Sequence, residues 1–227
     1  MSSLKRTKLA DRNLPDYTKG EEIFNMVSHI VGGAIGIAAL VLTVVFSAVK
    51  GNVWGVVTCA IYGATLIMLY TMSSIYHGMK SGTAKKVMQV LDHCTIYFLI
   101  AGTYTPILMC AIRPVYPFAA WGLFALVWGC AAVATVLTAI DLKKYAKFSM
   151  ACYIGMGWCI VLAVKPLLDT VDLQGIIWFL LSGGIAYTVG AVLYGIGKKH
   201  RYIHSIFHLF VIAGSVLHFS FIFFYII

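Results

Sequence analysis

Seven long apolar stretches dominate this chain, and each is long enough to cross a lipid bilayer. A spanning helix needs about 20 mostly apolar residues, because the hydrocarbon core of a bilayer is about 30 Å thick. The stretches cover residues 23–49, 53–77, 90–112, 118–140, 148–168, 176–196 and 202–227. With 61% of its 227 residues hydrophobic and 11% charged, the chain cannot be a water-soluble globular protein.

The sequence therefore predicts an all-α integral membrane bundle of seven transmembrane helices. This bundle occupies residues 23–227, and a polar tail precedes it at residues 1–22. The connections between the stretches are short, which leaves no room for a separate folded domain. We expect the tail to be cytoplasmic rather than a cleaved signal peptide, because it lacks an apolar segment that leads to a small-residue cleavage site.

The basic residues alternate between the two sides of the predicted membrane. Fourteen of the 17 fall in the tail and in the second, fourth and sixth connections: Lys5, Arg6, Lys8, Arg12, Lys19, Lys80, Lys85, Lys86, Lys143, Lys144, Lys147, Lys198, Lys199 and Arg201. The other side holds Lys50, Arg113 and Lys165. Because cytoplasmic flanks retain lysine and arginine during insertion, the N-terminus is predicted inside and the C-terminus outside.

The predicted orientation and the short connections exclude several classes of function. The net charge of +9 reflects membrane orientation, so we expect no nucleic-acid partner. A receptor coupled to G proteins has its N-terminus outside, and a retinal protein needs a lysine in its last span, which residues 202–227 lack. The connections predicted outside are too short to dock a protein hormone, so membrane lipids are the expected partners.

Polar side chains gather near the predicted cytoplasmic ends of four spans. Ionisable groups cost roughly 2.5–3.5 kcal/mol each at the centre of a spanning helix, so their positions carry functional information. The residues are Glu22, Asn25 and His29 in the first span, Ser73 and His77 in the second, Asp92 and His93 in the third, and His204 and His208 in the last. The predicted orientation puts all of them at one membrane depth.

Three of these histidines predict a zinc site. His204 and His208 are four residues apart and point the same way on a helix, so they can share one ion with His77. Three imidazoles with a fourth position for water are typical of catalytic zinc. A single histidine near a helix end is more often an interfacial or hydrogen-bonded residue, and only the shared depth of the three favours the metal.

Asp92 and Ser73 are the candidate catalytic residues beside this zinc site. Asp92 would hydrogen-bond the reacting water as a general base or an orienting group. Alternatively, it is an acid in the first helical turn that the helix dipole stabilises. Ser73 shares a face with His77, one turn (about 6 Å) deeper in the membrane.

The other polar residues of the spans are predicted to support the site or to lie away from it. Glu22, Asn25 and His29 lie on one helix face and are expected to support the ligands, for example by fixing a histidine tautomer, although a direct ligand role stays open. His218 lies about 15 Å beyond His208, too far to bind the same ion, and either hydrogen-bonds another helix or serves a proton path. His93 and His200 are interpreted as interfacial.

Cysteines and glycines are interpreted as structural. All six cysteines fall within spans and none forms a CxxC pair, so disulfides and a thiolate zinc site are not expected. The pairs Gly32 and Gly36, and Gly51 and Gly55, have the spacing that lets helices pack closely.

With these residues placed, the chain resembles the hemolysin III branch of the progestin and adipoQ receptor superfamily along essentially its whole length. The matching motifs are EE-x-x-N-x-x-x-H at residues 21–29, S-x-x-x-H at 73–77, D-H-x-x-I-Y-x-x-I-A-G-T-Y-T-P at 92–106, and H-x-x-x-H at 204–208 with the later His218. The resemblance implies seven helices with the N-terminus inside. In the adiponectin receptors, the histidines that match His77, His204 and His208 hold zinc, and the aspartate that matches Asp92 contacts it through water.

Two functions fit this resemblance. The receptor branch implies ceramidase-like hydrolysis of lipid amides, with Asp92 as base and Ser73 as a donor to the developing oxyanion. The bacterial branch is named for cytolysis, which fits a non-enzymatic membrane effector, either a pore or a sensor of lipid state, whose zinc is structural. Both place the protein in a cell membrane, expected to be a bacterial plasma membrane, with the zinc near the cytoplasmic leaflet.

The predicted orientation can be tested with reporters that are active only in the cytoplasm. A reporter fused at Lys85 should be active, and one fused at Ile227 should be silent, because the 14 to 3 distribution of basic residues sets the topology. Activity of the reporter at Ile227, or silence of the reporter at Lys85, would contradict the predicted topology.

Overall fold

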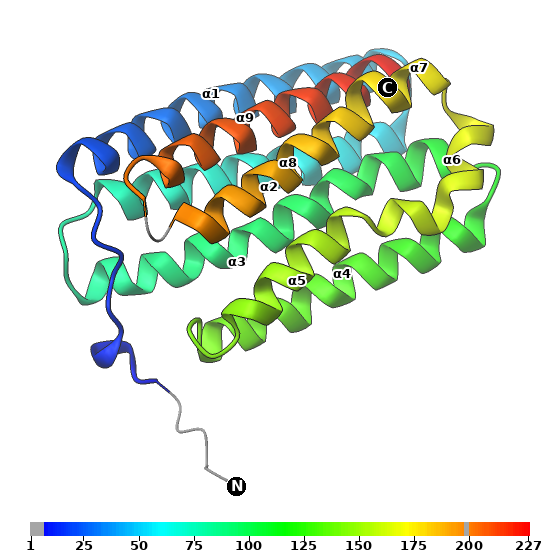
Figure 1. Cartoon of the computed structure of the whole chain (residues 1–227). Helices are drawn as coiled ribbons and strands as arrows, with labels where there is room; N and C mark the ends of the chain where they lie inside the picture. Colours follow the sequence, from blue (N-terminus) through cyan, green and yellow to red (C-terminus); the bar gives the residue numbers. More distant parts are fainter. Residues whose placement is uncertain (1–6, 198–199) are drawn as a thin grey trace, which may run out of the picture.

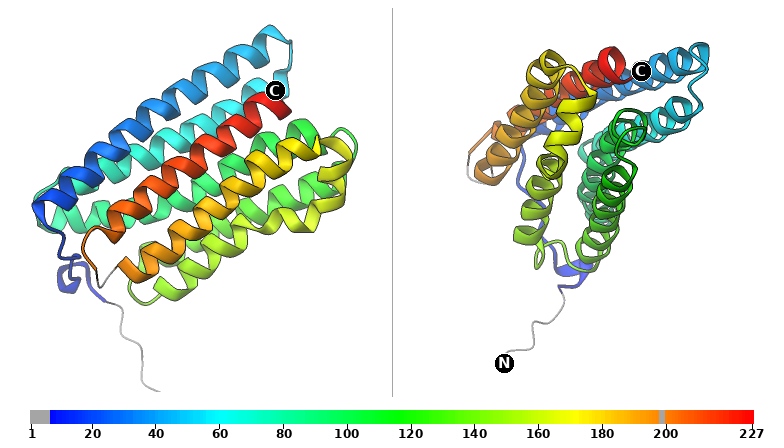
Figure 2. Two further views of the ribbon diagram at one scale, coloured as in Figure 1. Left: turned by 45° about the horizontal axis from the view of Figure 1, so that its top comes forward. Right: turned by 90° about the vertical axis from the view of Figure 1, so that its right-hand side faces the viewer.

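Seven helical segments are long and apolar enough to cross a membrane, which confirms the predicted all-α fold (Figure 1). The computed structural model describes residues 7–197 and 200–227, and within them no strand occurs. The segments are Lys19–Val49, Val53–Gly78, Thr83–Ile112, Pro117–Ile140, Ala146–Thr170, Leu173–Ile196 and Ile203–Ile226. Successive segments run in opposite directions through the bundle (Figures 1 and 2).

Three of these segments are single α-helices, and four are composite. The single helices are α1 (Lys19–Val49), α2 (Val53–Gly78) and α4 (Pro117–Ile140). The third segment joins α3 (Thr83–Pro106) to the π-helix η2 (Ile107–Ile112), and the last joins α9 (Ile203–Phe221) to the π-helix η6 (Ile222–Ile226). The sixth consists of α7 (Leu173–Gly175), the π-helix η4 (Ile176–Leu181) and α8 (Ser182–Ile196).

The fifth segment changes its helical geometry in the middle. It consists of α5 (Ala146–Gly157), the 3-10 helix η3 (Cys159–Ala163) and α6 (Val164–Thr170). Pro166 lacks the N–H that would bond the carbonyl of Leu162, and its ring clashes with that carbonyl in a regular helix. The break therefore precedes the proline, and regular α-helix resumes at Val164 with Pro166 in its first turn.

The helices are apolar on the outside and more polar on the inside. The buried residues of α1 recur every three or four positions, and most of them are polar or small: Glu21, Asn25, His29, Gly32, Gly36, Ala39, Thr43 and Ser47. Its exposed side chains include Ile30, Val41 and Val49, and Phe118 at the start of α4 is 94% exposed. A soluble bundle has the reverse pattern. The chain is therefore an integral membrane protein whose outer surface faces lipid.

Helix α3 lies at the centre of the bundle. In its segment 72% of the most apolar stretch is buried, against 11–50% in the other six. The helix starts at Thr83, seven residues before the predicted start at Val90. Its first two turns include Lys85 and Gln89, which are polar but buried. This earlier start changes the position of Asp92 along the helix.

Glycines let α1 and α2 approach closely. A Cβ at Gly32 would lie 2.4 Å from the Tyr70 ring, and one at Gly36 would touch Leu66, so the predicted packing role holds for this pair. It is wrong for Gly51, which has nothing within 4 Å and takes a φ of +68° in the turn between α1 and α2. Glycine is favoured there because other residues rarely adopt a positive φ.

One end of the bundle carries the chain segment before α1 and the connections α2–α3, α4–α5 and α8–α9 (Figure 1). We call it the basic end, because the described basic residues predicted to be cytoplasmic lie in these parts or in the adjoining helix ends. Lys5, Arg6, Lys198 and Lys199 were assigned with them and lie outside the described residues. Which membrane face this end occupies stays a prediction.

The close approach of α1 and α2 can be tested at Gly63. A Cβ added there would lie 2.6 Å from the Leu40 Cβ and 2.8 Å from its Cα, so Gly63→Ala must push the two helices apart. We expect a loss of about 1–3 kcal/mol in the free energy of unfolding, measured by denaturant titration in detergent. Gly129→Ala on α4 is the matched control, because nothing lies within 4 Å of it, and it should raise stability by about 0.5–1 kcal/mol.

Candidate metal centre

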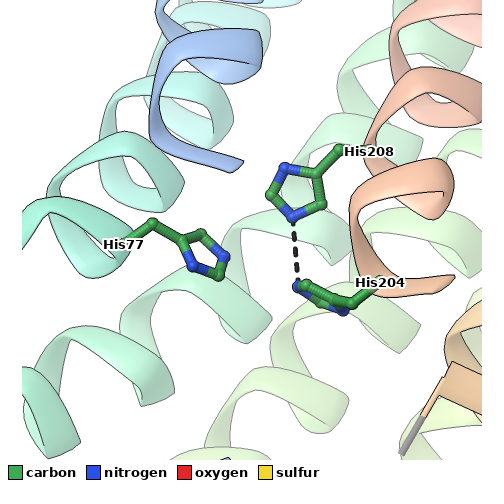
Figure 3. A group of neighbouring side chains, drawn as sticks. All are labelled: His77, His204 and His208. Carbon is green, nitrogen blue, oxygen red and sulfur yellow. Dashed lines mark hydrogen bonds between the residues drawn. The ribbon is translucent and has the colours of Figure 1, made fainter. Parts of the chain in front are cut away.

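Three buried histidines meet at the basic end of the bundle. His77 lies at the end of α2, and His204 and His208 lie in the first two turns of α9. One ligand atom from each lies within 4.8 Å of the other two. Figure 3 shows the three rings turned toward one another from the two helices. Helices that are far apart in sequence therefore bring the predicted histidines together.

The ring nitrogens are arranged as a metal ion requires. His77 Nδ1 lies 2.6 Å from Glu22 Oε2, which leaves His77 Nε2 buried without a hydrogen-bond partner among the described residues. The Nε2 atoms of His204 and His208 are 3.1 Å apart. Two imidazoles on one tetrahedral zinc, at about 2.0–2.1 Å each, have their nitrogens about 3.3 Å apart. These residues therefore fit a metal ion such as zinc.

Glu22 orients His77 from the first turn of α1. Its second oxygen, Oε1, accepts a hydrogen bond of 2.5 Å from Lys85 Nζ, and Lys85 also donates to the Met79 carbonyl at 3.0 Å. A carboxylate on Nδ1 fixes the histidine tautomer that leaves Nε2 free to bind a metal. The sequence predicts Lys85 only as a cytoplasmic basic residue, and its sequence context does not indicate that it contacts Glu22.

Asn25 and His29 lie on the same face of α1 but contact the site differently. The His29 ring stacks on the His208 ring, with centroids 3.7 Å apart and planes 21° from parallel. Neither nitrogen of His29 and neither polar atom of the Asn25 side chain has a hydrogen-bond partner in the described part of the chain. His29 thus packs against a candidate ligand and does not belong to the group of converging donors.

Asp92 lies beside the triad in the third turn of α3. Because α3 begins at Thr83, the alternative interpretation of Asp92 as a first-turn acid is wrong. The Asp92 and Ser73 side chains are neighbours, and both line a cavity that His204 and His208 of the triad also line. The predicted pair is therefore positioned next to the candidate metal ligands, with one carboxylate and one hydroxyl.

The other three histidines take different places. His93 was expected at the membrane interface but lines the same cavity, where its Nε2 lies 2.9 Å from the Tyr194 hydroxyl. The interfacial interpretation is wrong because α3 is central and meets protein on several faces. His200 is exposed in the connection between α8 and α9. His218 Nε2 donates to the Leu180 carbonyl at 3.1 Å, the interhelical hydrogen bond expected of it.

Glu21 is a structural residue of the site that the prediction did not assign. It completes a capping box with Thr18, and its Oε1 accepts the Tyr202 N–H at 2.7 Å. Tyr202 has a φ of +59° and immediately precedes α9. The first turn of α1 therefore fixes where α9 begins, and with it His204. The T-x-x-E pattern at residues 18–21 is a sequence signal that indicates the cap.

Tyr17 is the second residue that the prediction missed. Its ring stacks on the His204 ring, with centroids 4.9 Å apart, and lies 5.7 Å from the His77 ring. Burial raises the pKa of the Tyr17 hydroxyl above its usual range, so the side chain stays a neutral phenol. No sequence pattern indicates this contact, because Tyr17 precedes the first predicted span.

A cavity of about 910 Å³ opens beside the triad. Residues 11–17 border it at the basic end, and Trp158, Gly184 and His218 border its far end. Apolar side chains of α3 and α9, including Leu99, Ile100 and Val211, line the space between. The site thus combines three imidazoles, a carboxylate and a hydroxyl with a largely apolar chamber inside the bundle.

Comparison with known proteins gives the family. The haemolysin-III related family model matches residues 17–219. The chain belongs to this family. It is 36% identical to Hemolysin-3 of Bacillus cereus over 207 residues, 91% of this chain and 92% of the relative. It is 36% identical to the Hemolysin-3 homolog of Bacillus subtilis (strain 168) over 209 residues, 92% and 96% of the two chains.

A human relative extends the likeness beyond bacteria. The chain is 28% identical to the human Monocyte to macrophage differentiation factor over 193 residues, 81% of this chain and 76% of that protein. These matches confirm the resemblance to the hemolysin III branch of the progestin and adipoQ receptor superfamily.

Metal binding can be tested at Glu22. Glu22→Gln should weaken zinc binding about 10- to 100-fold, because the neutral amide holds the His77 tautomer less firmly. His77→Ala should abolish stoichiometric binding, and His29→Ala is the control that keeps it. The measurement is zinc content after dialysis against a graded metal buffer. If His29→Ala loses the metal and His77→Ala retains it, α1 supplies the ligand and our assignment is wrong.

Proposed function

We propose that this haemolysin-III family member is a zinc-dependent hydrolase that cleaves an amide or ester bond in a membrane lipid. The observation that carries this proposal is the position of the three converging histidines, next to Asp92 and at one end of a chamber inside a membrane protein. A site that only held the bundle together would need neither the neighbouring carboxylate nor the chamber.

In this proposal His77, His204 and His208 hold the ion through their Nε2 atoms. Zinc bound there would act as a Lewis acid, polarising the carbonyl of the substrate and lowering the pKa of a water toward about 7. Glu22 and Lys85 keep the His77 ring in place through the two hydrogen bonds to the Glu22 carboxylate. Rigid ligands keep a position open for the reacting groups.

Asp92 and Ser73 are the proposed catalytic residues. Asp92 accepts the proton of the attacking water and then returns it to the leaving amine or alcohol. Ser73 donates a hydrogen bond to the oxygen of the substrate carbonyl as its negative charge develops. Both side chains border the chamber, so a carbonyl bound beside the triad lies within their reach.

The chamber suits a lipid substrate. Its volume of about 910 Å³ falls in the range of about 300–1,000 Å³ that is typical of small-molecule pockets. Its apolar walls can accept an acyl chain, while the scissile bond stays at the polar end. We further propose that this end lies near the cytoplasmic leaflet of a bacterial plasma membrane, because the basic residues gather there.

A structural role for the metal is the second candidate function. His77 belongs to α2, whereas His204 and His208 belong to α9, so an ion would join two helices from opposite parts of the chain. The two bacterial relatives are named for hemolysis. In this alternative the protein is a non-enzymatic membrane effector, either a pore or a sensor of lipid state, that the ion stabilises.

A lipid hydrolysis assay separates the two functions. Purified protein in bilayers is incubated with a panel of ceramide-like amides and lipid esters, and the release of free fatty acid is followed together with zinc content and melting temperature. Asp92→Asn should keep zinc and lose turnover by about 10² to 10⁴, because the general base is removed. Asp169→Asn is the matched control, since that carboxylate lies away from the site and pairs with Lys165.

The alternative predicts a different set of results. A wild type that hydrolyses nothing in the panel, yet melts at a much lower temperature after zinc removal, would support the structural role. Undiminished turnover in Asp92→Asn would remove Asp92 from the mechanism.

A further inference from the structure

A segment of the chain outside the spans crosses the chamber at the basic end. Residues 7–17, which we call the N-terminal strap, precede α1 and contain one short 3-10 turn, η1 (Leu9–Asp11). Every residue from Asp11 to Tyr17 lines the chamber. The strap therefore forms the wall between the chamber and the exterior on this side.

Three hydrogen bonds hold the strap to the connections on either side of the chamber. The Thr7 N–H donates to Asp141 Oδ2 at 2.7 Å, and Arg12 Nη2 donates to the Ile140 carbonyl at 3.3 Å. Arg201 Nη1, in the connection between α8 and α9, donates to the Asp16 carbonyl at 2.7 Å. Because no helix continues through it, the strap can open at a lower free energy than any span.

Tyr17 is the residue of the strap that reaches the histidines. Both of its close ring contacts are with candidate ligands, His204 and His77. Its phenol also lies near Asp92 and Glu22. The capping box at Thr18 fixes the chain immediately after Tyr17, so the ring is held over the triad from a defined position.

Aromatic rings cover the triad on two sides, and the chamber borders it on a third. His77 and His208 are only 3% and 1% exposed, and the His29 ring covers His208. The Tyr17 ring covers His204 on the side of the strap. An ion that approaches His204 from the side of the strap must therefore pass the position that this ring occupies, whereas the chamber borders His204 and His208 on another side.

We propose that Tyr17 gates the metal centre: its ring covers the histidine triad on the side of the strap, and the main route of metal exchange with the aqueous phase opens when the ring and its strap move aside. This inference rests on the proposed metal centre and assigns a role to a residue outside the seven spans. It requires that removal of the ring changes how fast metal exchanges and leaves the ligands unchanged.

The kinetics of zinc exchange test this gate. Zinc-saturated protein is mixed with an excess of a water-soluble chelator, and apo protein is mixed with zinc, while zinc transfer is followed by the absorbance of the chelator or a metal indicator. We expect Tyr17→Ala to speed both release and uptake about two- to tenfold, because the stacking of the Tyr17 ring on His204 is lost. The equilibrium affinity should change less than threefold, and Tyr17→Phe should behave like the wild type.

Two further variants complete the design. Tyr145→Ala is the matched control, because this tyrosine also lies at the basic end but does not line the chamber, and its exchange rates should equal those of the wild type. Arg12→Gln removes the hydrogen bond that holds the strap at the Ile140 carbonyl and leaves the Tyr17 ring and the Glu21 contacts intact. It should speed exchange by a smaller factor and keeps the proposal testable if Tyr17→Ala does not fold.

The results distinguish failure of the gate from failure of the metal centre. Unchanged exchange rates in Tyr17→Ala, in a protein that still binds zinc, would overturn the gate alone. Faster release without faster uptake would also overturn it, since the ring would then only stabilise the bound ion. A wild type that binds no zinc would overturn the metal centre and the gate together, whereas absence of lipid hydrolysis would leave both standing.

Discussion

The bilayer requires every backbone polar group to be hydrogen-bonded inside the protein and keeps polar side chains away from lipid, and the rest of this structure follows from that requirement. It produces seven helices whose outer faces are apolar, and it gathers the polar side chains on the inner faces. The face of α1 that carries Glu21, Asn25 and His29 is buried for this reason, although all three are polar. The cost of placing such groups in a membrane makes their grouping at one end a functional signal.

The first turn of α1 links the two parts of the site. Glu22 holds His77 at the end of α2, and the adjacent Glu21 holds Tyr202 at the start of α9. Adjacent residues on a helix point about 100° apart, so the two carboxylates reach two different neighbours. This arrangement sets the distance between His77 and the α9 histidines through hydrogen bonds of the protein itself. The triad is thus preorganised by hydrogen bonds from a third helix.

In the proposed function, the site would combine water chemistry with an apolar substrate. The triad, Asp92 and Ser73 share one end of a chamber whose remaining walls are largely apolar. Within the described residues, the strap separates this end from the exterior. Such a layout favours a substrate with a polar, hydrolysable group on an apolar chain, and the family name alone would not indicate that chemistry.

The sequence by itself determined the number of spans, the class of fold and the three histidines, because hydrophobic length and the four-residue helical repeat are local properties. The predicted start of α3 and the predicted surroundings of His93 are wrong. Polar residues such as Lys85 are typical of the membrane interface, but at the start of a central helix they can be buried. Tertiary structure alone decided that Glu22 bonds His77, that His29 stacks on His208 and that Tyr17 covers His204. Those contacts depend on how helices distant in sequence are rotated and packed, and local pattern does not encode that rotation.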